Sequence, residues 1–240
     1  MGNKLTDRGV WENYWHSYRF GRLPAKSFYH AYLPQESRNK RFIEIGGFPG
    51  LNAYYFYKYV CDHITILDYY IDKEIISKIE TENNVPPDTI DTIEADFFNF
   101  SSPESYDIVF STGFIEHFVD TEDVIKRHID LLKQGGDLLI ILPNLRGLNG
   151  LIQYLFDKEN LNIHNLQSMD KKRLEDILKK YHLKNIKVEY LKKPMVWLEP
   201  KKGFLNKVGR ILVKGVSYLI KLFPIRSWFL SPYIILSAKK

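Results

Sequence analysis

Residues 41–50 read Arg-Phe-Ile-Glu-Ile-Gly-Gly-Phe-Pro-Gly, and this stretch decides the fold class. Its first half, Arg41–Ile45, is a short apolar run that predicts a buried β-strand. The glycines that follow permit a sharp turn and a close approach of the backbone to a ligand. Since Leu51–Val60 then predicts a helix, the stretch indicates a strand, a glycine-rich turn and a helix in succession.

The same alternation continues along the chain. Further strands are predicted at Ile64–Leu67, Thr89–Glu94, Tyr106–Phe110, Asp137–Leu142, Ile186–Leu191 and Tyr233–Ser237. Further helices are predicted at Ile71–Glu82, at Thr121–Lys133 with Thr121 as N-cap, and at Asp170–Tyr181 with Asp170 as N-cap. This pattern is typical of an α/β fold, a Rossmann-like and mostly parallel seven-stranded sheet with helices on both faces. Ligands of such sheets bind beyond the carboxyl ends of the strands, where we look for chemistry.

Composition limits the class of protein. The 240 residues are 45% hydrophobic and 15% aromatic, so the chain can bury a sizeable core. The one cysteine, Cys61, excludes an internal disulfide and a cysteine-rich zinc site. A reducing cytoplasm is the simplest compartment for such a chain. We find no set of residues with the spacing of metal ligands, and we predict no metal.

The glycine-rich turn departs from the dinucleotide-binding fingerprint. Gly-x-Gly-x-x-Gly, read from Gly46, requires glycine where this chain has Phe48 and Leu51. The acidic Glu44 before the glycines is not part of that fingerprint either. A nicotinamide-dependent oxidoreductase is therefore the less favoured enzyme class. Taken alone, the motif also fits an ordinary turn between a strand and a helix.

Four segments in chain order resemble the motifs of class I S-adenosylmethionine-dependent methyltransferases, in their small-molecule (type 11/12-like) branch. Glu44-x-Gly46-x-x-x-Gly50 is similar to the first motif, acidic-x-Gly-x-Gly-x-Gly, with Phe48 in place of the middle glycine. Asp68, which ends the second predicted strand, resembles the ribose-binding acid. Ala95-Asp96-Phe97 resembles the segment beside adenine, and residues 106–118 (YDIVFSTGFIEHF) resemble the fourth motif. The resemblance spans about residues 41–191.

This resemblance implies that S-adenosylmethionine is the cofactor and that methyl transfer is the reaction. The residues that it assigns to the cofactor are Glu44, Gly46, Gly47, Gly50, Asp68, Asp96, Phe97, Ser111 and Thr112. Glu116 and His117 face the reaction centre in this interpretation, with His117 as the candidate general base. Phe114 and His164 are candidates for contact with the methyl acceptor, although a plain loop hydrogen bond explains His164 at least as well.

The sequence limits the chemical class of the methyl acceptor but does not identify the molecule. The Asn/Asp-Pro-Pro-aromatic motif of nucleic-acid and protein amino methyltransferases is absent after the fourth strand. Its absence favours O-methylation of a small-molecule, sugar or lipid-linked acceptor, and we expect no nucleic-acid partner. A non-catalytic scaffold protein that kept cofactor binding is the alternative.

Two segments extend the predicted domain of residues 41–240. Residues 1–40 are predicted to form an N-terminal helical cap, in which the aromatic stretch Val10–Tyr18 either covers the cofactor or packs on the sheet. Residues 191–231 are predicted to form a basic, helical insertion before the last strand. From Leu191 to Lys240 the chain holds 11 Lys or Arg and one acidic residue, for a net charge of +10, whereas residues 1–190 carry −5.

The predicted helix Phe204–Phe223 is amphipathic. At 100° per residue, one arc of about 100° is polar and the opposite side is apolar. The polar arc contains Asn206, Lys207, Arg210, Lys214, Ser217 and Lys221, and the apolar side contains Phe204, Leu205, Val208, Ile211, Leu212, Val216, Leu219, Leu222 and Phe223. Its four charges disfavour a membrane span. The pattern fits either peripheral contact with an anionic membrane or burial of the apolar arc against the domain or a second subunit.

Overall fold

The computed structural model describes Leu5, Gly9, Glu12, Trp15 and residues 22–240, apart from residues 192, 200, 202 and 224 and the side chain of Leu205. Most of the predicted N-terminal cap, including most of Val10–Tyr18, lies outside the described residues. The described chain from residue 22 first forms a 3₁₀ turn, η1 (His30–Tyr32), against the sheet.

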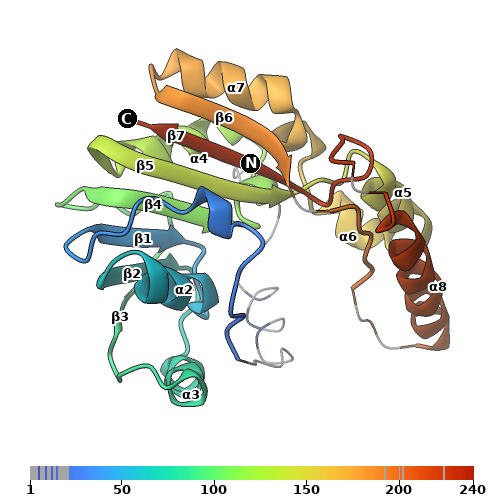
Figure 1. Ribbon diagram of the computed structural model, residues 1–240, viewed down its shortest axis with the longest axis horizontal. Coiled ribbons are helices and arrows are strands. Elements are labelled where there is room, and N and C mark those ends of the chain that lie inside the picture. The colour runs from blue at the N-terminus through green and yellow to red at the C-terminus, as the bar shows by residue number, and fades with distance from the viewer. Residues whose placement is uncertain are drawn as a thin grey trace.

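A seven-stranded sheet forms the centre of the fold, as predicted (Figure 1). Its strands are β1 (Arg41–Ile45), β2 (His63–Asp68), β3 (Ile90–Glu94), β4 (Tyr106–Thr112), β5 (Leu132–Pro143), β6 (Lys184–Leu191) and β7 (Tyr233–Lys239). They lie in the order β3-β2-β1-β4-β5-β7-β6. The first five strands are parallel, and β7 runs antiparallel between β5 and β6.

Helices cover both faces of the sheet. Side chains alternate along each strand, so the apolar strands present buried side chains on both faces. In β1, Phe42 lies in a core with α2 (Leu51–Tyr59) and α3 (Lys73–Asn83). Ile43 and Ile45 of the same strand lie in the opposite core, with α4 (Thr121–Asp130) and α7 (Lys171–Lys180). Each face therefore has its own hydrophobic layer, and the cores meet only through the sheet.

The cap of α4 differs from the prediction. Asp120, and not Thr121, is the N-cap, because its extended backbone lets its carboxylate accept from the amides of Glu122 and Asp123. The helix ends at Asp130 and not at Lys133, because β5 already begins at Leu132. The predicted N-cap of α7 is confirmed, since Asp170 accepts from the amide of Arg173 at 3.0 Å.

Three further segments lie between β5 and α7, and α8 follows β6. The sequence pattern did not predict α5 (Leu148–Phe156), α6 (Lys158–Asn162) or the 3₁₀ turn η3 (Leu166–Met169). The predicted amphipathic helix is α8 (Phe204–Ile220), which packs on α5 beyond one end of the sheet (Figure 1). No helix among the described residues is long and apolar enough to cross a membrane.

Candidate active site

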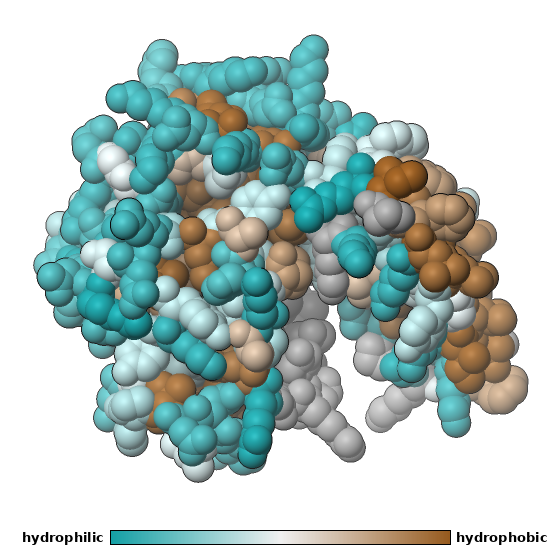
Figure 2. All heavy atoms as spheres, in the orientation of Figure 1, coloured by the Kyte–Doolittle hydropathy of each residue, from teal (hydrophilic) through white to brown (hydrophobic). Residues whose placement is uncertain are grey.

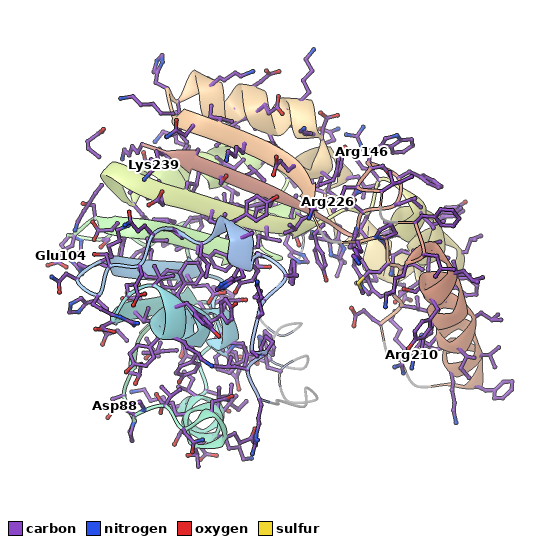
Figure 3. The ribbon with its side chains drawn as sticks, viewed as in Figure 1. Asp88, Glu104, Arg146, Arg210, Arg226 and Lys239 are labelled. Atoms are coloured by element: carbon purple, nitrogen blue, oxygen red, sulfur yellow. The ribbon has the colours of Figure 1, made fainter. Side chains whose placement is uncertain are left out.

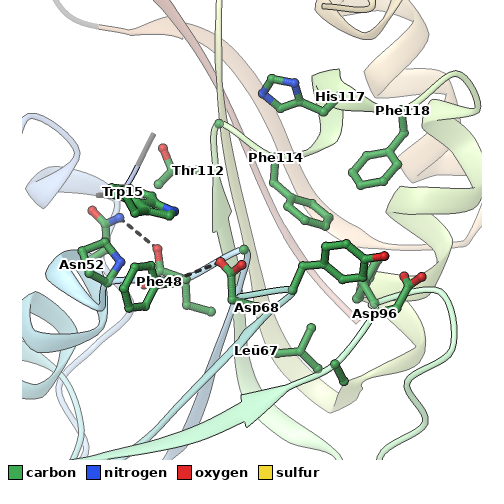
Figure 4. A pocket seen from close by; sticks show the side chains of 18 of the residues that line it. Trp15, Phe48, Asn52, Leu67, Asp68, Asp96, Thr112, Phe114, His117 and Phe118 are labelled. Carbon is green, nitrogen blue, oxygen red and sulfur yellow. Dashed lines mark hydrogen bonds between the residues drawn. The ribbon is translucent and has the colours of Figure 1, made fainter. Parts of the chain in front are cut away.

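A cavity of about 260 Å³ opens at the carboxyl ends of β1, β2, β3 and β4 (Figure 4). Parallel strands align these ends at one edge of the sheet, so segments far apart in sequence surround one space. Of the predicted site residues, Glu44, Gly46, Gly47, Asp68, Asp96, Phe97, Thr112, Phe114 and His117 line it. The structure therefore brings nine of the predicted residues around a single cavity.

The loop after β1 is shaped by the absence of side chains at Gly46 and Gly47. Gly46 has a φ of +66°, and a Cβ there would lie 2.4 Å from Cδ2 of Phe114. A Cβ at Gly47 would lie 2.9 Å from the side chain of Glu44. The amide of Gly46 donates to the carbonyl of Leu67 at 2.8 Å, which fixes the loop against the end of β2. The two glycines thus let the backbone form one wall of the cavity.

Asp68 projects from the end of β2 into the cavity (Figure 4). Its Oδ2 accepts from the amide of Phe48 at 3.0 Å, and its Oδ1 accepts from the amide of Tyr70 at 3.2 Å. Burial raises the pKa of Asp68 to about 6, although both amides favour the ionised form. A carboxylate oxygen has two acceptor positions, so each oxygen retains acceptor capacity for a ligand.

Glu44 lies under the glycine loop and is 1% exposed. Its Oε1 accepts from Asn52 Nδ2 at 2.9 Å, and Tyr29 in turn donates to Asn52 Oδ1 at 2.7 Å. Its Oε2 is buried and has no hydrogen-bond partner among the described residues. Burial raises the pKa of Glu44 to about 8. A buried acceptor that borders a cavity and lacks a partner is a candidate for contact with a polar ligand group.

Aromatic rings form the remaining apolar walls. Phe97 follows β3 and meets Phe114 edge to face, with ring centroids 5.4 Å apart. Trp15 lies edge-on to Phe48 at 5.5 Å and lines the cavity from the N-terminal segment. Asp96, between β3 and Phe97, accepts from the amide of Phe98 at 3.0 Å, so part of its acceptor capacity fixes the local turn.

At the far side of the cavity a 3₁₀ turn, η2 (Ile115–His117), follows β4. Its backbone is held by Asn165, whose amide donates to the carbonyl of Glu116 at 2.6 Å and whose side chain donates to the carbonyls of Phe118 and Val119. His117 borders the cavity (Figure 4), while Glu116 lies behind it and is 1% exposed. Asn165 therefore fixes the turn that presents His117.

Glu116, His117 and His164, which the sequence assigned to the reaction centre and the acceptor, lie together as a group of possible metal ligands, which the sequence did not predict. Their ligand-type atoms all lie within 4.8 Å of one another. His164 Nδ1 donates to the carbonyl of Asn160 at 2.6 Å, which leaves its Nε2 as the acceptor nitrogen. Burial raises the pKa of Glu116 to about 8 and lowers that of His117 to about 3. Three groups with the chemistry of metal ligands thus meet here in their neutral forms.

Four of the predicted site residues do not line the cavity: Gly50, Ser111, Glu116 and His164. Gly50 is the N-cap of α2 and has the left-handed conformation, with a φ of +94°. Ser111 donates through Oγ to His128 Nε2 at 3.1 Å, because His128 Nδ1 donates to the carbonyl of Val124. Glu116 and His164 reach the cavity only through His117.

The sequence also missed residues of the cavity wall. Asn52 lies in the first turn of α2, and its one sequence signal is a polar side chain two residues after Gly50. Tyr69 and Phe98 directly follow two residues that the sequence did single out, Asp68 and Phe97. Such residues are found only when the residue after each predicted site residue is also considered.

Several solved structures share the fold. A SAM-dependent methyltransferase from Archaeoglobus fulgidus superposes with a TM-score of 0.57 and 17% identity, over 88% of this chain and 91% of that one. Phosphoethanolamine N-methyltransferase 2 of Haemonchus contortus, solved with S-adenosyl-L-methionine, superposes with a TM-score of 0.60 and 19% identity, over 86% of this chain and 50% of that one. No curated protein sequence matches the chain.

A family comparison adds evidence from the sequence itself. Residues 14–188 match the family described as a methyltransferase domain. This match covers well over half of the 240 residues and includes every segment that surrounds the cavity. The chain therefore belongs to the methyltransferase-domain family and is a class I S-adenosylmethionine-dependent methyltransferase.

Proposed function

We propose that this chain transfers a methyl group from S-adenosylmethionine to a hydroxyl oxygen of a small-molecule, sugar or lipid-linked acceptor, and that His117 receives the hydroxyl proton. The observation that carries this proposal is the position of His117 on the same cavity as Asp68 and the glycine loop. When bound, S-adenosylmethionine supplies a methyl group on a positively charged sulfur. The protein must then mainly align the acceptor and exclude water.

The residues around the cavity fit the cofactor chemically. Asp68 retains acceptor capacity for ribose hydroxyls, in addition to its two backbone donors. An ammonium group beside Glu44 would favour the ionised carboxylate, whose buried Oε2 would then be a suitable acceptor. Phe97 offers an apolar surface beside Asp96, which suits an adenine ring with an exocyclic amine. The glycine backbone admits a close ligand where side chains would collide.

His117 is neutral before the acceptor arrives, and a nearby negative charge must raise its low pKa for it to accept a proton readily. Its pKa is lowered, first by burial and then by His164, so the imidazole is neutral at physiological pH. The carboxyl Oε1 of Glu116 lies 3.9 Å from His117 Nε2. An ionised Glu116 would stabilise the imidazolium that forms when His117 takes the proton. Glu116 is a positioning residue here, because it does not reach the cavity.

A titration with cofactor, followed by an acceptor screen, tests the proposal. We expect S-adenosylmethionine and S-adenosylhomocysteine to bind in a calorimeter, and NADH to give no heat. We then expect radiolabelled methyl groups to pass to hydroxylated acceptors and not to matched amines. Absence of cofactor binding would overturn the proposal. Binding without transfer to any acceptor would favour the non-catalytic scaffold, and transfer to an amine would replace the oxygen acceptor.

A further inference from the structure

Helix α8 packs on the domain by a narrow face that contains Val213 and Ile220 together with small residues, and not by its apolar arc. Val213 and Ser217 are 2% and 6% exposed, and a Cβ at Gly209 would lie 3.1 Å from the ring of Phe156. The Ser217 hydroxyl accepts from the amide of Val196 at 3.3 Å. These residues recur every four positions, so a single stripe of α8 faces the protein. The apolar arc is left on the opposite side.

That apolar arc is exposed to solvent. Phe204, Ile211, Leu219 and Leu222 are 78%, 64%, 65% and 76% exposed. The arc continues onto exposed residues of α5 and of the segment after α8, and Figure 2 shows brown side chains gathered over α5 and α8. We call the whole surface the apolar face: Leu151, Tyr154, Leu155, Phe204, Val208, Ile211, Leu212, Val216, Tyr218, Leu219, Leu222, Phe223, Trp228 and Phe229. A continuous exposed patch of this kind marks a protein or membrane contact.

A row of positive charge borders one side of the apolar face. Lys207, Arg210, Lys214 and Lys221 lie on one flank of α8, between the buried stripe and the apolar arc. Together they line a groove whose floor is apolar and includes Val196 and Leu198. Arg210 of this row is labelled on α8 in Figure 3. We call these four residues the basic flank.

The charges around the apolar face indicate whether a second copy of the chain or a membrane binds there. From Phe204 to Ser231 the chain contains five basic residues and no acidic one. An isologous contact with a second copy would bring two such segments together, and Glu199, the acidic residue that precedes them, already interacts with Arg210 of its own chain. An anionic bilayer offers both an apolar interior for the face and phosphates for the basic flank. Trp228, Tyr218 and Phe229 add the aromatic side chains that favour the lipid interface.

We propose that α8 docks the protein on the surface of an anionic membrane, with the apolar face in the acyl boundary and lipid phosphates in the groove of the basic flank. In this proposal α8 lies in the interface and does not cross the bilayer, because its charged flank stays among the headgroups. Resting on the proposed function, we further infer that the methyl acceptor is presented at the membrane surface. The docked helix would hold the cavity near an acceptor that cannot diffuse into bulk water.

Vesicle flotation of the full chain tests the docking. We expect the protein to float with vesicles of phosphatidylcholine and phosphatidylglycerol at low salt, and less with phosphatidylcholine alone or at high salt. Replacement of Lys207, Arg210, Lys214 and Lys221 by glutamate should weaken binding more than 100-fold, since each loss costs about fivefold. The control variant replaces Lys73, Lys78, Lys172 and Lys179, exposed lysines of α3 and α7, by glutamate. It makes the same change in net charge and should float as the wild type does.

Further measurements separate the alternatives. Replacement of Phe204, Leu219 and Leu222 by serine should abolish flotation even at low salt, with the melting temperature unchanged. The docking is overturned if the wild type stays unbound at low salt, if the two glutamate variants float equally, or if light scattering shows a dimer that the serine variant dissociates. Calorimetry with S-adenosylmethionine and no vesicles tests the proposed function separately, so each proposal can fail alone.

Discussion

The imidazole rings of His117 and His164 lie 4.8 Å apart between centroids, and only His117 borders the cavity. His164 Nδ1 donates to the carbonyl of Asn160, and the pKa of His117 is lowered first by burial and then by the nearby His164. Burial lowers the pKa of both imidazoles and raises that of Glu116. Both imidazoles are therefore neutral at physiological pH, and His117 can accept a proton from the cavity while His164 packs against its other side.

Replacement of His117 should separate turnover from cofactor binding. We expect His117→Ala to lower kcat by about 100-fold, the lower end of general-base contributions, because alignment of the acceptor does most of the work. Affinity for S-adenosylhomocysteine in a calorimeter should stay unchanged. His63→Ala, at the exposed start of β2, is the matched control and should retain full turnover. Equal turnover in the His117 variant and the wild type would reject the role of base.

The pH dependence of turnover should report Glu116. Burial raises its pKa to about 8, so it is protonated below this pH and becomes a carboxylate above it. A carboxylate 3.9 Å from His117 favours the protonated imidazole, so kcat at saturating cofactor should rise as the pH passes through 8. Glu116→Gln should remove this rise without altering the rate at pH 6. A rise that persists in the glutamine variant would assign it to another group.

The cluster of Glu116, His117 and His164 also tests the prediction that no metal is needed. Neighbouring ligands of a tetrahedral zinc lie about 3.3 Å apart, for bonds of about 2.0–2.1 Å, whereas these donor atoms spread over as much as 4.8 Å. Dialysis against EDTA should therefore leave turnover unchanged. Loss of turnover that added Zn²⁺ or Mg²⁺ restores, but Ca²⁺ does not, would show that the cluster binds a metal.

The strand ends are what the sequence predicted best, and the reason is geometric. Apolar runs followed by glycine or aspartate place Gly46, Asp68 and Asp96 at the same edge, because parallel strands align their carboxyl ends. Ser111 and Thr112 show the limit of this reasoning. The predicted strand ended at Phe110, whereas β4 continues to Thr112, so the side chains alternate and only Thr112 faces the cavity.

Contacts between segments that are distant in the chain could not be predicted from the sequence. A helical wheel gives the arcs of α8 but not which arc packs, and the small stripe of Gly209, Val213 and Ser217 could be recognised only once Phe156 and Val196 lay against it. Helix α5 escaped prediction because it begins after Gly147 with no side-chain cap. The role of Asn52 is visible only in the structure, where its side chain donates to the buried carboxyl of Glu44, eight residues earlier in another element.

Asp68 should control cofactor affinity in a pH-dependent way. Its pKa of about 6 means that the carboxylate is protonated below this pH and loses acceptor capacity for ribose hydroxyls. Affinity for S-adenosylhomocysteine should therefore rise from pH 5 to pH 7 and then level off. Asp68→Ala should cost about 2 kcal/mol of binding at pH 7.5, while Asp176→Ala on α7 should cost nothing. Unchanged affinity in the Asp68 variant would remove it from the site.

Two glycines provide a matched test of the loop that begins the site. Gly46→Ala forces a side chain into a φ of +66° and against Phe114, so it should destabilise the protein by about 1–3 kcal/mol and weaken cofactor binding. Gly215→Ala makes the same chemical change inside α8, where a new Cβ meets nothing within 4 Å, and should stabilise by about 0.5–1 kcal/mol. Urea unfolding of both variants gives the comparison. If Gly46→Ala is as stable as the wild type, the loop can reorganise, and the close approach of backbone to Phe114 is not what shapes the cavity.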